Sequence, residues 1–198
     1  VVKFGGKSLA NGTGLQHAIE IILDKVKNQE KCTIVVSARG NTTNELEEIL
    51  EKAATKKEYL SDFEKLKNYQ LEPNKNVDFS AEFSKLKTIF EGVSLLGDFS
   101  EKIKDEVLAQ GELLSVKLVA SLLENKGIPV KIADARNLII TDENFGNAQP
   151  IKTISKENTV QFFKENSKTL NLVTGFIASN QKNETTTLGR NGSNYTAA

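Results

Sequence analysis

The sequence predicts an α/β fold with a largely parallel sheet, and three observations lead to this prediction. Short apolar runs of strand type alternate with segments that carry apolar residues at helical spacing, as in βαβ units. Several of the runs end in glycine, serine or aspartate, where open parallel sheets bind their ligands. The chain has 198 residues, enough for one domain with a substantial core.

The first 55 residues supply two strand–helix pairs. In order, we expect a strand over 1–4, a helix over 15–26, a strand over 32–37 and a helix that begins near residue 42. Both strands are short apolar runs, whereas the helices repeat apolar residues every three or four positions. Thr42 and Glu45 have the spacing of a capping box, which predicts the start of the second helix.

Residues 56–110 have a different character. Lysine and glutamate are dense there, and no strand-like run interrupts them. The apolar residues again recur at helical intervals, among them Phe63, Leu66, Leu86, Phe90 and Val93. We therefore expect a helical insertion packed beside the sheet.

The strand–helix rhythm resumes after this insertion. We expect a helix that Gly111 opens, strands over 130–134, 138–141 and 170–178, and a helix over 159–165. Near the end, Ser193 follows Gly192 as a helix cap would, and the helix would be cut off after about one turn. We expect a truncated chain.

Composition excludes several classes of function. Lysine plus arginine (26) balance aspartate plus glutamate (26), and no long basic block suggests a nucleic-acid partner. No run approaches the ~20 apolar residues of a membrane span. Cys32 is the only cysteine, which predicts a reducing, cytoplasmic location without an internal disulfide. With His17 as the only histidine, no Ser-His-Asp triad can be argued. The sequence also contains no Cys/His cluster of zinc-site type, so we expect no metal site formed by protein ligands.

Two glycine-rich loops are candidates for anion binding. The first follows the N-terminal strand, as "KFGGKS" at 3–8; it is not a P-loop, because Val1 stands where that motif needs glycine. Its alternative interpretation is a plain strand-to-turn transition. The second, 189–193, enters a helix N-terminus, where free N–H groups and the helix dipole favour anions.

Four side chains could carry chemistry, each with a plainer alternative. Lys3 lies in an apolar strand and would need an anionic partner such as a phosphate. Arg190 could hold a carboxylate or phosphate, or be a surface arginine. Glu112 is either a first-turn glutamate or a carboxylate that awaits an ammonium group. Thr43 is either part of a helix cap or a hydroxyl directed at a ligand.

Five segments, taken together, resemble the aspartokinases of the amino-acid kinase family. They are "KFGGKS" (3–8), "VVSARGNTTNEL" (35–46), "QGELLS" (110–115), "GIPVKIADARNLIITDENFGNAQP" (127–150) and "VTGFIASNQKNETTTLGRNGSNYTAA" (173–198). They occur in the family's order and cover the chain except for the helical region, and the last is the most specific.

This resemblance implies a three-layer αβα sandwich of the carbamate kinase-like type, of which the chain would be the N-terminal lobe. It implies phosphoryl transfer from MgATP to the β-carboxylate of L-aspartate, the first step of lysine, threonine and methionine biosynthesis. By residue, Lys3 would stabilise the transferring phosphoryl group and be the catalytic residue. The ATP phosphates would also contact Gly5, Gly6, Ser8 and Ser37, and aspartate would contact Thr43, Glu112, Arg190 and Ser193.

The chain departs from the family pattern at Lys7, where threonine is usual, and at Asn194, where aspartate is usual. We expect the lobe for ATP and the regulatory domains to lie outside residues 1–198, so that this chain alone is inactive. The residues of the last segment resemble those of the bifunctional aspartokinase–homoserine dehydrogenase subgroup, in which a homoserine dehydrogenase domain would use NADP. The resemblance also implies a homodimer or higher homo-oligomer of the full-length protein.

Two alternatives stay open from the sequence. One is a related kinase that acts on glutamate or N-acetylglutamate, although Glu112 and Arg190 together favour a free α-amino acid. The other is an amino-acid-binding or assembly fragment without kinase chemistry.

Overall fold

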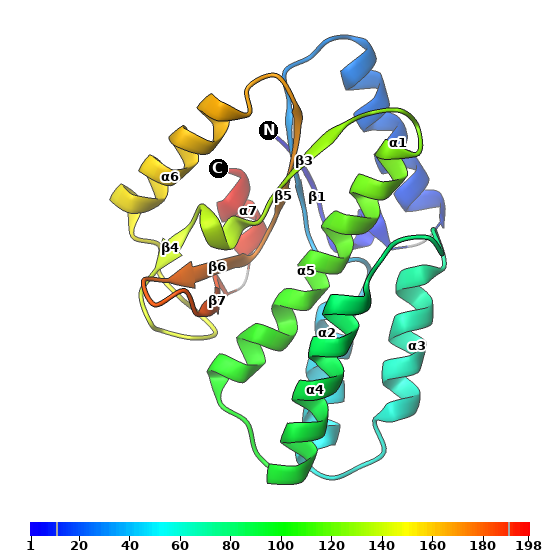
Figure 1. The fold of residues 1–198 in the computed structure, drawn as a ribbon, viewed down its shortest axis with the longest axis vertical. Helices are drawn as coiled ribbons and strands as arrows, with labels where there is room; N and C mark the ends of the chain where they lie inside the picture. The colour runs from blue at the N-terminus through cyan, green and yellow to red at the C-terminus, as the bar shows by residue number, and fades with distance from the viewer. Residues whose placement is uncertain (11, 190) are drawn as a thin grey trace.

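The structure, a computed structural model, describes residues 1–10, 12–189 and 191–198 (Figure 1). The helices are α1 (Gly12–Lys27), α2 (Thr42–Ala54), α3 (Leu60–Leu71), α4 (Ser80–Leu96), α5 (Glu101–Glu124), α6 (Lys152–Glu165) and α7 (Gly192–Ala197). The strands are β1 (Val2–Phe4), β2 (Thr33–Val36), β3 (Val130–Ala133), β4 (Ile140–Thr141), β5 (Leu170–Thr174), β6 (Ile177–Asn180) and β7 (Thr185–Thr187). Short 3₁₀ turns, η1 (Gly6–Leu9) and η2 (Ala135–Asn137), follow β1 and β3.

The main sheet is parallel, with strand order β1-β2-β5-β3. Each neighbouring pair is joined by a crossover that contains at least one helix, as parallel pairing requires. All four strands therefore point their carboxyl ends toward the same edge. The predicted α/β class with a largely parallel sheet is confirmed.

Helices cover both faces of this sheet. On one face, Phe4, Ile34 and Leu172 pack against apolar side chains of α1 and α5. On the other face, Val35 and Val173 belong to a core that includes side chains of α6 and α7. Because strand side chains alternate between faces, both cores come from the same strands, and the result is the expected three-layer arrangement.

The predicted helical region is a distinct group of helices with its own core. Helices α2, α3 and α4 and the first half of α5 lie side by side below the sheet (Figure 1). Their shared core contains Leu50, Phe63, Leu86 and Phe90, all almost completely buried. Edge-to-face contacts join the Phe63 and Phe90 rings, whose centroids are 5.4 Å apart.

Helix α5 corrects one sequence prediction. It begins at Glu101, with Ser100 as N-cap, and not at Gly111, which lies in its middle. The glycine at position 111 allows a close contact between helix and loop, because a Cβ there would lie only 3.0 Å from the Cβ of Ala38. The loop after β2 therefore packs directly on the helix at this point. This one helix therefore belongs to both the sheet layer and the helical group.

Other boundaries also differ from the predictions. The capping box at Thr42 and Glu45 is wrong: Asn41 is the N-cap of α2, and the Thr42 hydroxyl donates to the Arg39 carbonyl oxygen at 2.6 Å. Helix α6 begins at Lys152, seven residues before the predicted start. The last predicted strand is two strands, because the chain turns at Phe176 and continues as β6 in a second sheet of order β4-β6-β7.

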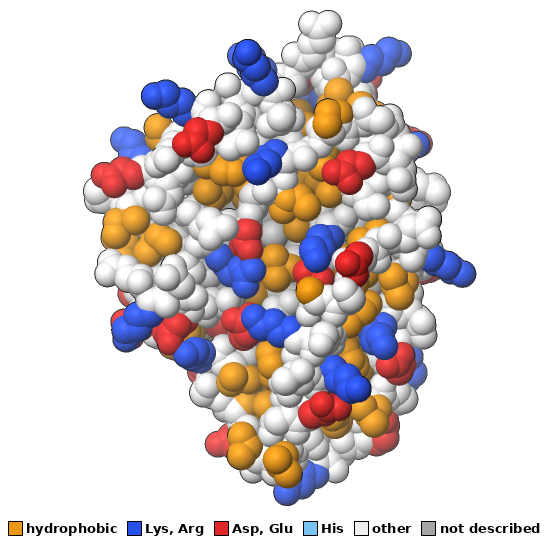
Figure 2. Space-filling model, in the orientation of Figure 1, with side chains coloured by type: hydrophobic (Ala, Val, Ile, Leu, Met, Phe, Trp, Pro, Cys, Tyr) orange, Lys and Arg blue, Asp and Glu red, His pale blue; other side chains and the backbone are white. Residues whose placement is uncertain are grey.

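The surface carries both charge signs in close mixture. On the face shown in Figure 2, lysine and arginine side chains alternate with aspartate and glutamate, and apolar side chains lie between them. No helix in the described parts of the chain is long and apolar enough to cross a membrane.

Candidate functional site

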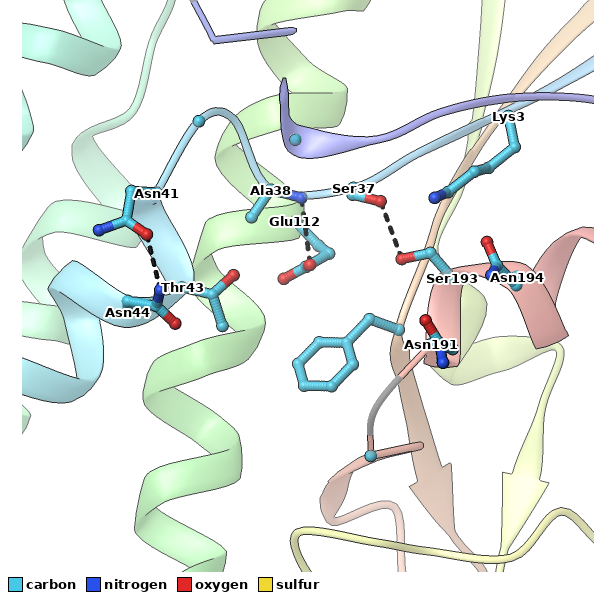
Figure 3. Close-up of a pocket in the computed structure, with 15 residues that line it drawn as sticks. Lys3, Ser37, Ala38, Asn41, Thr43, Asn44, Glu112, Asn191, Ser193 and Asn194 are labelled. Atoms are coloured by element: carbon cyan, nitrogen blue, oxygen red, sulfur yellow. Dashed lines mark hydrogen bonds between the residues drawn. The ribbon is translucent and has the colours of Figure 1, made fainter. Parts of the chain in front are cut away.

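A pocket of about 350 Å³ opens at the carboxyl edge of the main sheet, next to the strands β1 and β2 (Figure 3). Three walls enclose it: the loop from β2 into α2, the middle of α5, and the segment from β7 into α7. The described residues that line it are Lys3, Gly6, Ser37, Ala38, Gly40, Asn41, Thr43, Asn44, Glu112, Phe176, Gly189, Asn191, Gly192, Ser193 and Asn194. Five separate stretches of the sequence thus meet here.

Glu112 is the most deeply buried acid of the pocket, with 2% of its surface exposed. Its Oε1 accepts a hydrogen bond of 3.1 Å from the backbone N–H of Ala38, and its Oε2 has no partner among the described residues. Burial raises the pKa of Glu112 to about 8, and the bond from Ala38 opposes this effect only in part. A buried carboxylate oxygen without a partner is costly, so the site favours an incoming cationic donor.

Glu112 corrects the plainer of its two sequence interpretations. It lies eleven residues into α5 and so cannot stabilise the first turn of that helix. Its place is set instead by the close packing of Gly111 on Ala38. Figure 3 shows the Glu112 carboxyl group between Thr43 and Ser193 in this view.

Lys3 reaches the pocket from the other side. Figure 3 shows its side chain directed from β1 toward Ser37 and Ser193. Strand β1 is an edge strand, and Lys3 is exposed, so the expected cost of burying a lysine in an apolar strand does not arise. Within the described residues its ammonium group has no hydrogen bond or ion pair, and it is available to an anion.

Two serines join the strand wall to the α7 wall. The Ser37 hydroxyl, just after β2, donates to the Ser193 hydroxyl over 2.9 Å. Gly175 permits this approach, because a Cβ there would come within 2.6 Å of the Cβ of Ser193. The two hydroxyl groups lie between Lys3 and Glu112 in Figure 3 and offer both donors and acceptors to a polar ligand.

The glycine-rich turn after β1 is held against the loop after β2. The carbonyl oxygen of Gly6 accepts a hydrogen bond of 2.9 Å from Gly40 N–H. A Cβ on Gly6 would lie 2.7 Å from the Ala38 carbonyl oxygen, so only glycine fits there. A Cβ on Gly5 would lie 3.4 Å from the Lys3 ammonium nitrogen, so glycine keeps the space beside that charge open. These features fit a phosphate group next to Lys3.

The first turn of α2 continues the wall that the loop after β2 forms. Thr43 is partly buried and lines the pocket, while the neighbouring Thr42 points into the helical group. The Asn44 side chain donates to the Asn41 side chain at 2.6 Å, which holds two amide groups at the pocket rim. Thr43 therefore faces the pocket and does not act as a cap.

The structure brings together most of the residues singled out from the sequence. Those that line the pocket are Lys3, Gly6, Ser37, Thr43, Glu112 and Ser193. Gly5 and Ser8 do not line it, and neither does the exposed Lys7 of η1. Arg190 lies outside the described residues.

The sequence analysis missed Asn41, Asn44 and Phe176. Phe176 has a left-handed backbone with φ of 66°, which is unusual for a bulky residue and turns its ring into the pocket. Its position directly after Gly175 was the one available signal. Asn41 and Asn44 stood next to Thr43 in a segment already singled out, but nothing in their spacing indicated a role.

Across residues 1–10, 12–189 and 191–198, no group of three or more His, Cys, Asp or Glu side chains is arranged to hold a metal ion.

Comparison with known proteins identifies the family. The family model described as "Amino acid kinase family" matches residues 1–198, the whole chain. The chain belongs to the amino acid kinase family. Its relatives within this family include the bifunctional aspartokinase/homoserine dehydrogenase of Buchnera aphidicola, 30% identical over all of this chain and 26% of the relative. Lysine-sensitive aspartokinase 3 of Escherichia coli is 28% identical over all of this chain and 45% of the relative.

Solved structures agree with this assignment to the amino acid kinase family. The crystal structure of E. coli aspartokinase III in complex with aspartate and ADP superposes with a TM-score of 0.85 at 28% identity, over 99% of this chain and 44% of that one. The chain therefore spans from about a quarter to somewhat less than half of the length of these relatives.

Proposed function

We propose that this chain is the N-terminal part of the catalytic domain of an aspartate kinase, which transfers a phosphoryl group from MgATP to the β-carboxylate of L-aspartate. The observation that carries the proposal is the buried Glu112, whose Oε2 has no partner in the described part of the chain, in a pocket that also contains Lys3. The pocket thus offers a negative group and a positive group to one ligand. The aspartokinase relatives and the aspartate in the E. coli crystal structure support the choice of amino acid.

The amino end of aspartate would bind at Glu112. Its ammonium group can donate to the free Oε2, and this replaces a costly unpaired oxygen with a charge-assisted hydrogen bond. The ammonium charge would also lower the raised pKa of Glu112, so binding would release a proton at neutral pH. An acetylated amino group lacks this charge, which argues against N-acetylglutamate as substrate.

The phosphate end of the reaction would lie at the first glycine-rich turn. Lys3 would stabilise the charge on the transferring phosphoryl group, and Gly5, Gly6, Ser8 and Ser37 would surround the ATP phosphates. When bound, MgATP supplies the phosphoryl group. No protein nucleophile is needed, because a carboxylate oxygen of the substrate attacks the phosphorus atom, and the protein contributes position and neutralising charge.

The other aspartate contacts follow from the resemblance. Thr43 and Ser193 line the same pocket and would hydrogen-bond the substrate, and Arg190 would hold its α-carboxylate. The proposal includes an ATP lobe and regulatory domains beyond residues 1–198, a cytoplasmic location and a homo-oligomeric full-length enzyme. NADP would enter only if a homoserine dehydrogenase domain is present, as in the Buchnera relative.

Calorimetry with this chain, and turnover with the full-length protein, test the proposal. L-aspartate should bind this chain, and Glu112→Gln should weaken the binding about 30- to 100-fold, while L-glutamate and N-acetyl-L-glutamate should bind far more weakly than L-aspartate. The full-length protein should form an acyl phosphate from aspartate and ATP, which hydroxylamine traps. A clear preference for glutamate in both assays would show that glutamate, and not aspartate, is the substrate. Aspartate binding without turnover would leave an amino-acid-binding protein instead of a kinase.

A further inference from the structure

Asp105 is a completely buried acid outside the pocket, with 0% of its surface exposed. It lies in the first half of α5 and accepts three hydrogen bonds. Its Oδ2 accepts from the N–H groups of Gly146 at 2.9 Å and Thr187 at 3.0 Å, and its Oδ1 accepts from the Thr187 hydroxyl at 2.7 Å. Burial raises its pKa, and the three donors act in the opposite direction. All three donors belong to segments other than α5, so this side chain fastens one part of the fold to another.

The strand that Asp105 holds leads directly into the pocket. Thr187 is the last residue of β7, and Gly189, two residues later, lines the pocket. The loop over 142–149 supports the same strand, because Ala148 N–H donates to the Thr187 carbonyl oxygen at 2.9 Å. Gly189 itself packs on this loop, since a Cβ there would lie 2.5 Å from the side-chain oxygen of Asn147. Asp105 binds both segments at the point where they meet.

The helix that carries Asp105 also carries Glu112. The two acids are seven positions apart, which is close to two helical turns, so they lie on the same side of α5. One of them binds β7 and the other lines the pocket. We therefore expect the Asp105 bonds to help set the spacing between Glu112 and Gly189.

We propose that Asp105 is a positioning residue for the amino-acid substrate: its three hydrogen bonds to Gly146 and Thr187 fix the distance between the two pocket residues Glu112 and Gly189. This inference rests on the proposed function, because it assigns the substrate to the space between these two residues. The turn after β1 is held by a different contact, from Gly40 N–H to the Gly6 carbonyl oxygen, and does not depend on Asp105. The effect is thus specific to aspartate and does not extend to ATP.

Asp105→Ala and Asp105→Asn in the full-length enzyme separate this role from a general loss of stability. Alanine removes the acceptor of the Gly146 and Thr187 N–H groups and of the Thr187 hydroxyl. Asparagine can accept from both N–H groups with its carbonyl oxygen and donate its amide N–H to the Thr187 hydroxyl. We expect Asp105→Ala to raise the KM for aspartate about tenfold or more and to change the KM for ATP less than about twofold, whereas Asp105→Asn should stay within about threefold of the wild type.

Glu82→Ala is the matched control. Glu82 is also a buried acid that fastens α5, through an ion pair of 2.6 Å with Lys117, but it binds α5 to α4 and not to the pocket loop. It should lower the melting temperature without a change in the KM for aspartate. Two results for Asp105→Ala would overturn the inference: equal changes in the KM values for aspartate and ATP, or an unchanged KM for aspartate. A loss of activity in Asp105→Asn as large as that in Asp105→Ala would also overturn it.

Amide hydrogen exchange provides a second test that needs no substrate. Asp105→Ala should speed exchange of the Thr187 and Gly146 N–H groups, which donate to Asp105, about tenfold or more, while Asp105→Asn and Glu82→Ala should not. Unchanged exchange in Asp105→Ala would overturn the positioning role. A wild-type enzyme that does not phosphorylate aspartate would instead refute the proposed function, and the exchange result would then decide whether Asp105 holds the loop.

Discussion

Glu112 and Lys3 line the same pocket but are placed there in opposite ways. Glu112 is in the middle of a long helix and almost unexposed, and one of its oxygens has no hydrogen-bond partner among the described residues. Lys3 is on a three-residue edge strand and is exposed to solvent. The buried Glu112 carboxylate has little contact with water and depends on a bound cation to stabilise its charge, whereas water solvates the Lys3 ammonium group until a ligand binds. The comparison indicates that the fold preorganises one end of the site and leaves the other to be completed by its ligand.

Lys3→Met should have the largest effect. In the full-length enzyme we expect kcat to fall about 100- to 1,000-fold, because one charged group that stabilises the transferring phosphoryl group is lost. The fold should be retained, since Lys3 is exposed and makes no bond among the described residues. Steady-state kinetics and circular dichroism measure the two quantities.

The matched control for Lys3 is Lys7→Met, which removes an exposed lysine of the same glycine-rich turn that does not line the pocket. Its kcat should stay within about twofold of the wild type. A fall as large as that of Lys3→Met would show that the turn needs positive charge in general and not Lys3 in particular.

Glu112→Gln should weaken aspartate binding about 30- to 100-fold while ATP binding is retained. The amide keeps the shape and the bond from Ala38 N–H, but it no longer offers a negative charge to the ammonium group. Titration calorimetry measures the affinity. An unchanged affinity would place the amino group of the substrate elsewhere and would leave the unpartnered Oε2 unexplained.

The same residue predicts a dependence of stability on pH. The folded-state pKa of Glu112 is raised from 4.5 to about 8, so its contribution to stability is complete below pH 4.5 and is lost as the pH rises through about 8. The loss for this one group is roughly 3 to 5 kcal/mol. Urea unfolding at several pH values should show the wild type losing stability in this window relative to Glu112→Gln. A constant difference between the two proteins would mean that folding does not shift the pKa of Glu112.

Ser193→Ala should have the smallest effect. It removes the hydroxyl that accepts from Ser37 but leaves both charged groups in place. One neutral hydrogen bond is worth about 1 kcal/mol, so the KM for aspartate should rise about fivefold. Steady-state kinetics of Ser193→Ala measure this KM. A much larger effect of Ser193→Ala would indicate a direct contact with the reacting groups.

The sequence by itself determined the fold class and most of the candidate site. Continuous apolar runs followed by glycine or serine marked β1 and β2 and located Gly6 and Ser37 at the pocket edge. These signals are local, because a strand end and a glycine-rich turn depend on residues next to each other in the chain. Glu112 and Ser193 were found through motifs of adjacent residues for the same reason.

Only the tertiary structure decided how these residues are placed. Gly111 suggested a helix start because glycine weakens a helix, yet α5 continues through it since the loop at Ala38 needs the space. Lys3 suggested a buried charge because its neighbours are apolar, yet β1 is an edge strand and the side chain is exposed. Asp105 gave no signal in sequence, because its three donors lie 41 and 82 positions away. Contacts between such distant segments depend on packing, and local sequence patterns do not encode them.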